Sequence, residues 1–224
     1  MRGYRVLRLV LLALAITLAI GWMPASAGNE RKAAPVGQHE HTQPHGPIAA
    51  QVSVCFVPAQ ACDATIAAAI AGAHSVIRVQ AYGFTSPVIL HALADARARG
   101  LDVQAILDKS DDVAEAGERP GARSRASGAR FTAEANIPTW IDDSVAIAHN
   151  KVIIIDGHLV IGGSYNYTSS AEHRNAENVT FIESPSLAEL YLGNWEARKA
   201  VARPSSFQSD AGSDGARTLA ARGR

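Results

Sequence analysis

Short apolar runs alternate with segments of helical character through the middle of the chain. Three of these runs are rich in β-branched residues and predict strands at residues 52–57, 76–82 and 101–107. Asp63 is expected to cap a helix over residues 64–73. Ser86-Pro87 and Gly100 are the start and stop signals of a second helix. The alternation predicts an α/β fold with a mixed, largely parallel β-sheet flanked by helices.

The second half of the chain departs from this alternation. Residues 108–135 are polar and predict a long loop that either contacts phosphate groups or is solvated and mobile. Its arginines are Arg119, Arg123, Arg125 and Arg130. Residues 179–182 predict a further strand. A last helix is expected from Ser184-Pro185, with an apolar stripe packed into the core: Leu187, Leu190, Tyr191 and Trp195.

Two apolar runs flank Asp156-Gly157, and this arrangement is a strong signal for a two-residue β-hairpin turn. Such a turn pairs Ile155 with His158, which places His149 opposite Ser164 and Lys151 opposite Gly162. A bulge at Gly162-Gly163 would shift this register by one residue.

The expected register gathers polar residues on one face of the hairpin, because side chains alternate between faces. These residues are His149, Lys151, Gly162, Ser164 and Asn166. Histidine is a nucleophile or proton donor near neutral pH, and lysine supplies positive charge. Serine and asparagine add hydrogen-bond donors, so the cluster suits a phosphoryl oxygen whose negative charge must be stabilised. A lone histidine on a strand is more often structural, but its polar neighbours favour a catalytic role here.

Two carboxylates accompany the cluster. Asp156 lies seven residues beyond His149, on the order of 20 Å along a strand, and is therefore predicted to be structural. Glu177 precedes the strand at 179–182 and is predicted to accept the imidazole N–H of His149, as a carboxylate does in catalytic triads. The alternative is that Glu177 is a solvent-exposed strand end.

Residues 1–27 have the pattern of an export signal. Arg2, Arg5 and Arg8 precede an apolar run at 9–20, and Ala25-Ser26-Ala27 forms a small-residue cleavage site. An uncleaved signal anchor is the alternative. Either form places the domain outside the cytoplasm, so we expect a periplasmic or secreted protein.

In that oxidising compartment Cys55 and Cys62 are predicted to form a disulfide joining the first strand to the first helix. Two cysteines with no histidine within a few residues of them make a poor zinc site.

Composition and charge bound the rest of the chain. With 224 residues and 47% hydrophobic residues, the chain is globular, and residues 51–202 are enough for one domain. Residues 28–50 predict a flexible linker, whose His39, His41 and His45 bind a metal ion loosely or are simply solvated. Residues 203–224 predict a disordered tail. Because 21 basic residues balance 21 acidic ones, affinity for a polyanion requires a local patch.

The spacing His149-x-Lys151-x4-Asp156, followed by Gly162-Gly163-Ser164-x-Asn166 and Asn175-Ala176-Glu177-Asn178, resembles the phospholipase D superfamily. The likeness extends over about residues 50–202 and is greatest to the small bacterial phospholipase D-like endonucleases with one motif per chain. It implies a phospholipase D-like fold with a catalytic β-hairpin and phosphodiester cleavage through a phosphohistidine, without metal or cofactor. Carried over, His149 is the nucleophile or acid, Lys151 binds phosphate, Ser164 and Asn166 line the pocket, and Glu177 orients His149.

The chemistry also predicts a second subunit. In-line displacement places the nucleophile and the leaving oxygen on opposite sides of phosphorus, and one imidazole cannot serve both sides. The chain has one motif, since neither His158 nor His173 is followed by a lysine two positions on. We therefore expect a twofold homodimer with one His149 from each subunit at the site.

Three functions are compatible with the sequence. The first is a non-specific endonuclease acting on DNA or RNA, whose arginine-bearing loop follows the backbone. The second is a phospholipase, although no amphipathic basic helix or exposed aromatic cluster indicates a membrane-facing rim. The third is a non-catalytic nucleic-acid-binding protein. We expect a nucleic acid substrate as partner and no stable membrane association after signal cleavage.

Overall fold

The computed structural model describes residues 46–112 and 127–207. The expected signal peptide, residues 28–45 of the expected linker, residues 113–126 with three of the loop arginines, and residues 208–224 lie outside this part. The described strands are β1 (Gln51–Val57), β2 (Val76–Ala81), β3 (Asp102–Asp108), β4 (Thr139–Asp142), β5 (Lys151–Ile155), β6 (Leu159–Gly163), β7 (Glu177–Glu183) and β8 (Arg203–Pro204). The described helices are α1 (Cys62–Ala71), α2 (Pro87–Ala98), α3 (Gly128–Glu134), α4 (Ser169–Arg174), α5 (Pro185–Val201) and the short 3-10 turn η1 (Lys109–Asp111).

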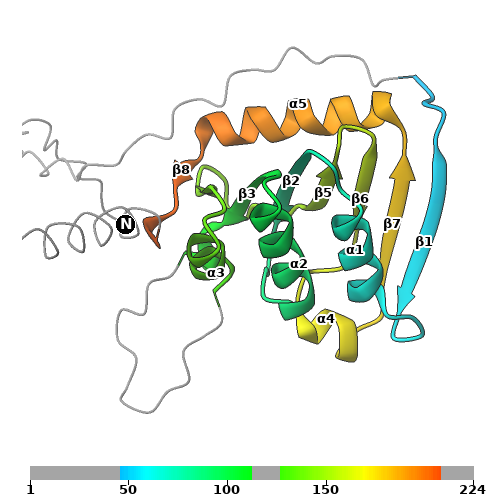
Figure 1. Ribbon diagram of the computed structural model, residues 1–224, viewed down its shortest axis with the longest axis horizontal. Helices are drawn as coiled ribbons and strands as arrows, with labels where there is room; N and C mark the ends of the chain where they lie inside the picture. The colour runs from blue at the N-terminus through cyan, green and yellow to red at the C-terminus, as the bar shows by residue number, and fades with distance from the viewer. Residues whose placement is uncertain (1–45, 113–126, 208–224) are drawn as a thin grey trace, which may run out of the picture. The chain divides into compact units, whose positions relative to one another are not determined.

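The strands form a single mixed sheet in the order β1-β7-β6-β5-β2-β3-β4-β8 (Figure 1). The pairs β2–β3 and β3–β4 are parallel, and the other pairings between described strands are antiparallel. The predicted mixed α/β sheet with flanking helices is confirmed, but its parallel part is smaller than expected. The reason is that α2 and α3 connect neighbouring strands as crossovers, whereas β1 does not pair with β2 after α1 and lies beside β7 instead.

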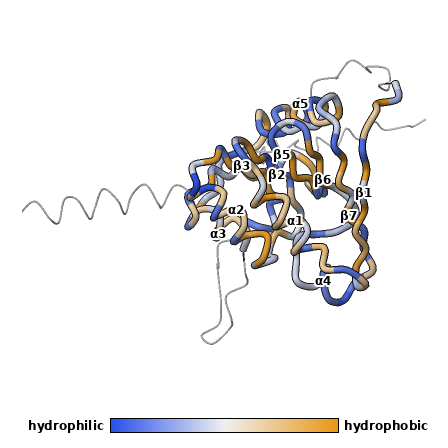
Figure 2. The backbone as a smooth tube through the Cα atoms, turned by 45° about the vertical axis from the view of Figure 1, so that its right-hand side comes forward, coloured by the Kyte–Doolittle hydropathy of each residue, from blue (hydrophilic) through white to orange (hydrophobic). Residues whose placement is uncertain are grey.

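Helices cover the two faces of the sheet unequally. On one face α5 packs Ala188 and Trp195 against Val152 and Ile154 of β5, and the Trp195 indole donates a hydrogen bond to the Val79 carbonyl at 3.0 Å. On the other face α1, α2 and α3 cover the larger apolar core (Figure 1). Because β5 is buried on both faces, its residues 152–155 form a continuous apolar run, drawn in orange in Figure 2.

Most of the predicted helix boundaries are confirmed. Ser86 precedes Pro87 at the start of α2, and Gly100 follows the helix with φ +93°, a conformation that favours glycine. Ser184 caps α5 by accepting a hydrogen bond from the Leu187 amide at 3.4 Å. The cap predicted at Asp63 is wrong: α1 begins at Cys62, two residues before the expected start at residue 64, and Asp63 lies in its first turn.

The long loop expected over 108–135 is partly helical, since α3 occupies Gly128–Glu134. The Ser127 hydroxyl caps this helix by accepting from the Arg130 amide at 3.3 Å. Glycine is required at 128, because a Cβ atom there would lie 2.4 Å from the Phe84 carbonyl oxygen. Helix α3 starts with a glycine that serves close packing, and so its sequence has the composition of a loop.

The domain also extends beyond residue 202, where the tail was expected to be disordered. Arg203 and Pro204 form β8 on the outer side of β4. The Arg203 guanidinium pairs with Asp112 at 2.7 Å and with Asp143 at 3.0 Å, and the Ser205 hydroxyl donates to Asp112 at 2.7 Å. These polar contacts order residues 203–207, and a search for apolar periodicity cannot detect them.

The predicted disulfide between Cys55 and Cys62 is present and joins β1 to the first residue of α1, with 5.7 Å between the Cα atoms. Both cysteines are buried in the larger core. No helix in the described ranges has both the length and the apolarity needed to cross a bilayer.

Candidate active site

The β5–β6 hairpin has a register one residue away from the expected one. Val152 pairs with Gly162 and Ile155 pairs with Leu159, so the loop contains three residues rather than two. The cause lies at Asp156, whose amide donates to the Val76 carbonyl at 2.9 Å and so continues the β5–β2 ladder. The loop therefore closes one residue later on the β6 side.

This shift changes which glycine faces the lysine. Continuing the observed register places Lys151 opposite Gly163 rather than Gly162. Gly163 adopts φ +151°, and a Cβ atom there would lie 2.3 Å from the Asn178 carbonyl oxygen. Glycine is therefore required at 163 for the close approach of β6 to the start of β7.

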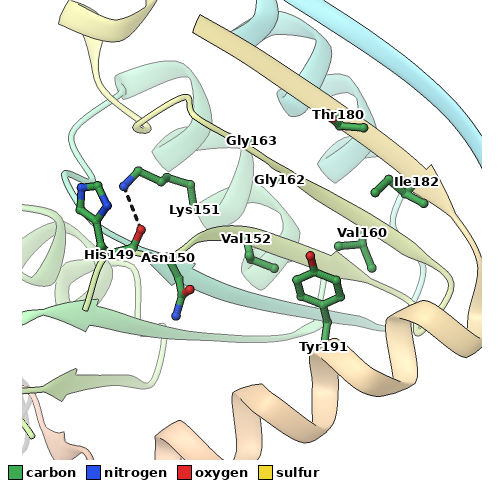
Figure 3. Close-up of a pocket in the computed structure, with 10 residues that line it drawn as sticks. All are labelled: His149, Asn150, Lys151, Val152, Val160, Gly162, Gly163, Thr180, Ile182 and Tyr191. Carbon is green, nitrogen blue, oxygen red and sulfur yellow. Dashed lines mark hydrogen bonds between the residues drawn. The ribbon is translucent and has the colours of Figure 1, made fainter. Parts of the chain in front are cut away.

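A pocket of about 380 Å³ opens on the sheet at the beginning of β5. Figure 3 shows His149, Asn150 and Lys151 at one end and Tyr191 of α5 at the other. The remaining lining residues are Val152, Val160, Gly162, Gly163, Thr180 and Ile182. The pocket thus joins a basic end to an apolar floor.

Lys151 is the buried cation of this pocket, with 8% of its surface exposed. Its Nζ donates to the His149 carbonyl at 2.8 Å and lies 5.2 Å from the centroid of the Tyr82 ring. Burial lowers the pKa of Lys151, while the negative charge of Glu177 acts in the opposite direction. The ammonium is thus fixed beside the histidine backbone and partly removed from water, where its charge acts strongly on an anionic ligand.

His149 is exposed and stands on the ring of Tyr82, with 4.7 Å between the ring centroids. The segment before it is tied to the end of β3: the Ala148 amide donates to Asp108 at 2.8 Å, and Lys109 donates to the Val145 carbonyl at 3.0 Å. Burial alone would raise the pKa of Asp108, but hydrogen bonds from Ser110 and Ala148 outweigh it and hold the pKa below its ordinary value. His149 is thereby held on a short, anchored segment.

Tyr82 and Asp108 support His149, and the sequence analysis did not single them out. Both lie at the carboxyl end of a predicted strand, Tyr82 after β2 and Asp108 at the end of β3. Because β2 and β3 are parallel neighbours, these ends meet at the same edge of the sheet. A polar residue at the carboxyl end of each of two parallel strands is the sequence signal that indicates such supporting residues.

Ser164 and Glu177 form one hydrogen-bonded unit. The Ser164 hydroxyl donates to Glu177 Oε2 at 2.5 Å and accepts from the Asn178 amide at 3.1 Å. Asn175 donates to Glu177 Oε1 at 2.9 Å. No hydrogen bond joins Glu177 to His149 within the described chain, so orientation of His149 by Glu177 remains a prediction.

Asn166 lies after the end of β6 and does not line the pocket. It packs against the turn after β2, where a Cβ atom at Gly83 would lie 3.7 Å from Asn166 Cβ. Its Oδ1 atom is buried and accepts no hydrogen bond from any described residue. The structure therefore brings His149 and Lys151 together in the pocket, joins Ser164 to Glu177, and places Asn166 beside Gly83, outside the pocket lining.

Asp156 lies at the opposite end of β5, outside the pocket. Its carboxylate accepts from the amides of His74, Ser75 and Val76 and from the Ser75 hydroxyl, at 2.8 to 2.9 Å. Burial alone would raise the pKa of Asp156, but these hydrogen bonds lower it to about 2. The contacts tie the hairpin to the start of β2, which fits a structural role.

Comparisons with known proteins show the family of this chain. Residues 66–197 match the family described as "Cardiolipin synthase, PLD-like domain". The chain is 43% identical to a Rickettsia bellii protein named phospholipase D over 150 residues, which is 67% of this chain and 70% of that one. It is 29% identical over 128 residues to the mouse mitochondrial cardiolipin hydrolase, covering 57% of this chain and 53% of that one.

Solved structures give the same result. The crystal structure of Nuc from Salmonella typhimurium, a phospholipase D family member, is 35% identical with a TM-score of 0.61, covering 70% of this chain and 98% of that one. Fold and site thus define a phosphodiesterase with a histidine and a lysine at one end of a pocket on the sheet. The chain belongs to the phospholipase D superfamily and is a hydrolase of phosphodiesters.

Proposed function

We propose that the protein is a metal-independent endonuclease that cleaves DNA or RNA through a phosphohistidine on His149. The observation that carries this proposal is the pairing of an exposed imidazole with a buried ammonium. Lys151 is held 2.8 Å from the His149 carbonyl in a pocket open at the protein surface. A polymer can reach such a site without entering a closed cavity.

In the proposed reaction, a ring nitrogen of His149 attacks phosphorus, so that a P–N bond forms as the P–O bond to the leaving group breaks. His149 of the partner subunit donates the proton that the departing oxygen takes up. Water then attacks the phosphohistidine, giving up a proton to that second imidazole and releasing His149. Lys151 stabilises the charge that builds on the non-bridging oxygens.

This mechanism needs two subunits, and we propose a twofold homodimer. General acid catalysis contributes about 10²–10⁴-fold, which a single imidazole already used as nucleophile cannot supply on the opposite side of phosphorus. The exposure of His149 supports the assembly, because a second subunit can approach the ring. Sedimentation or light scattering measures the oligomeric state directly, and a strict monomer that is active would contradict this part.

Support for a nucleic acid substrate comes from the segment that carries Arg119, Arg123 and Arg125. It leaves the described domain at Asp112 and returns at Ser127, whose hydroxyl donates to the Asp111 carbonyl at 2.5 Å. Both ends of the segment therefore lie next to η1, at the carboxyl end of β3. Asp108, at that same strand end, holds the segment leading to His149. The sequence between these two ends supplies three arginines, and arginine charge is what a nucleic acid backbone binds.

A second candidate is a phospholipase, and one structural feature favours it. Val52, Val54 and Phe56 form an exposed apolar row along β1, with 63%, 46% and 53% of their surfaces accessible. Val52 pairs with Ile182, and Val54 with Thr180, both of which line the pocket. The apolar floor thus continues to the sheet edge, a rim that the sequence analysis did not predict and that a lipid could use.

We further propose that the domain works in the periplasm or after secretion. The export pattern of residues 1–27 and the Cys55–Cys62 disulfide support this location. Expression of the full chain with a periplasmic marker, followed by fractionation, tests it.

One assay separates the candidates. Supercoiled plasmid, single-stranded RNA and phosphatidylcholine vesicles are each incubated with the full protein in excess EDTA. We expect cleavage of nucleic acid that falls as salt rises, and no release of choline. Release of choline without nucleic acid cleavage selects the lipid candidate, and activity abolished by EDTA overturns the metal-independent mechanism.

A further inference from the structure

A buried carboxylate outside the motif lies in α4, the helix that follows Ser164 and Asn166 in the chain. Glu172 of α4 has only 7% of its surface exposed. A buried charge of this kind is stable only when several hydrogen bonds compensate for its removal from water. The partners of Glu172 therefore show what it holds in place.

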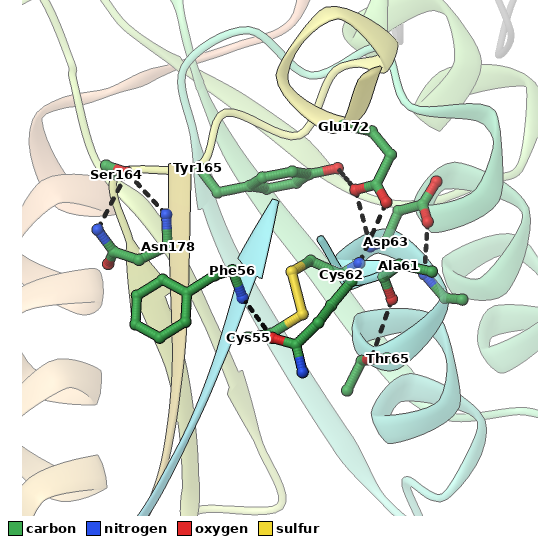
Figure 4. Close-up of a disulfide and its surroundings, with 12 residues drawn as sticks. Cys55, Phe56, Ala61, Cys62, Asp63, Thr65, Ser164, Tyr165, Glu172 and Asn178 are labelled. Atoms are coloured by element: carbon green, nitrogen blue, oxygen red, sulfur yellow. Dashed lines mark hydrogen bonds between the residues drawn. A yellow bond between two sulfur atoms is a disulfide. The ribbon is translucent and has the colours of Figure 1, made fainter. Parts of the chain in front are cut away.

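Three donors converge on Glu172 from two parts of the chain (Figure 4). The amides of Cys62 and Asp63, at the start of α1, donate to Oε1 at 3.1 Å and Oε2 at 3.2 Å. The Tyr165 hydroxyl donates to Oε2 at 2.8 Å. The positive end of the α1 dipole and the phenol thus share one carboxylate.

Tyr165 connects this carboxylate to the motif. It is buried, with 1% of its surface exposed, and stands between Ser164 and Asn166 in the sequence. The hydrogen bond of the Tyr165 hydroxyl restricts this side chain, and with it the backbone of Ser164 and Asn166 on either side. Glu172 is thus linked, through Tyr165, to the residue that donates the hydrogen bond to Glu177.

The disulfide holds the other side of the same arrangement. Cys62 supplies one of the amides that bind Glu172, and its sulfur is bonded to Cys55 of β1. Cys55 pairs with Val179, and Val57 pairs with Glu177, at the start of β7. The disulfide therefore ties the α1 amides to the strand that carries Glu177.

We propose that Glu172 is a positioning residue for the active site and that the Cys55–Cys62 disulfide keeps it in register. Glu172 acts through Tyr165 on Ser164 and does not itself touch the substrate. Loss of the disulfide frees the start of α1 and weakens the hold on Glu172, so the turnover of the enzyme depends on this bond. The inference rests on the active site proposed above, not on which phosphodiester it cleaves.

The test compares Tyr165→Phe with Tyr167→Phe. Both tyrosines are buried and two residues apart, but the Tyr167 hydroxyl has no hydrogen-bond partner in the described chain. With bis(p-nitrophenyl) phosphate as substrate, well below the melting temperature, we expect Tyr165→Phe to lower kcat about tenfold with KM within about twofold. Tyr167→Phe is expected to leave both constants unchanged. Equal kcat for the two variants would overturn the proposal.

A second comparison tests the link to the disulfide. We expect Cys55→Ala/Cys62→Ala to lower kcat severalfold in the wild-type background and to have little further effect when combined with Glu172→Gln. Effects that multiply independently would overturn the proposed coupling. If the cysteine variant does not fold, Glu172→Gln alone must still reproduce the kcat loss of Tyr165→Phe.

Hydrogen exchange supplies a readout that does not need activity. Tyr165→Phe is expected to speed amide exchange in peptides covering residues 61–64 and 163–167, but not in α2. Unchanged exchange in both peptides would overturn the positioning role. A wild-type protein that cleaves no phosphodiester would contradict the proposed function, while the exchange comparison would still decide this inference.

Discussion

Two charged residues of the motif lie at the two ends of β5, and their hydrogen bonding differs. At one end Asp156 accepts four hydrogen bonds from residues 74–76 and lies outside the pocket. At the other end Lys151 lines the pocket and donates one hydrogen bond, to the His149 carbonyl, among the described residues. A charge whose bonding capacity is filled by backbone stabilises the fold, whereas a buried charge with free capacity beside a pocket can bind a ligand.

Substitutions of the reactive side chains at the pocket end of β5 should have the largest effect on turnover. His149→Ala deletes the proposed nucleophile, and we expect no detectable turnover. Lys151→Met keeps the packing and removes the charge, which should lower kcat by about 10²–10³-fold. Single-turnover kinetics measures both, and unchanged circular dichroism shows that the fold persists. Lys199→Met serves as control, because Lys199 lies against Trp140 and Trp195 and does not line the pocket.

Removing the carboxylate at the other end should cost stability instead. Asp156→Asn is expected to lower the free energy of unfolding by about 2 kcal/mol, because an amide cannot accept all four hydrogen bonds. The kcat of the folded variant should stay near the wild-type value. Urea unfolding gives the stability, and Asp63→Asn is the matched control, since the Asp63 carboxylate accepts a local hydrogen bond, from the Ala64 amide. A large kcat loss with native stability would reverse our assignment of Asp156.

The same residue predicts a pH dependence. The pKa of Asp156 is about 2 in the folded protein against an ordinary value of 3.8, so folding favours the ionised form. Its contribution is fully present above the ordinary value and is lost as the pH falls through the folded value. We expect the stability difference between wild type and Asp156→Asn to be constant above about pH 5 and to shrink between about pH 4 and 2. A difference that stays constant down to pH 2 would contradict this.

The smallest effect is expected at Tyr82, which supports His149 without taking part in the reaction. Tyr82→Leu removes the ring beneath the imidazole, and a ring contact of this kind is worth about 0.5–1.5 kcal/mol. We therefore expect kcat to fall about threefold to tenfold, measured at saturating substrate. Tyr82→Phe keeps the ring and should remain within about twofold of wild type. A Tyr82→Phe variant as impaired as Tyr82→Leu would assign the role to the hydroxyl instead.

The sequence predicts the parts of this protein that depend on local pattern. Predicted strands, the caps at Ser86 and Ser184 and the Cys55–Cys62 pairing follow from apolar periodicity, turn chemistry and residue type. The hairpin register shows the limit, because it is decided by the hydrogen bond from the Asp156 amide to the carbonyl of Val76 in β2, far away in the chain. A local turn signal such as Asp156-Gly157 does not predict that long-range contact.

Long-range packing explains the other differences. The order of strands and helices along the chain does not predict that β1 pairs with β7, because the neighbours of a strand in the sheet are determined by tertiary packing. Helix propensity does not predict α3, because the helix begins with Gly128. That glycine is required by the close contact with Phe84, which the sequence does not show. In the site, the motif spacing predicts His149 and Lys151 directly. Tyr82, Asp108 and Glu172 lie on other elements, and the motif spacing does not predict them.

The central claim is that His149 forms a covalent bond to phosphorus without metal. Mass spectrometry of the protein, quenched at alkaline pH during turnover of nucleic acid in excess EDTA, tests it most directly. We predict a phosphorus-linked nucleotide adduct on the peptide that contains His149, absent from His149→Ala, because the attacked phosphorus stays esterified to one of the two nucleic acid fragments. Full turnover in EDTA with no adduct at any quench time, or turnover retained by His149→Ala, would contradict the account.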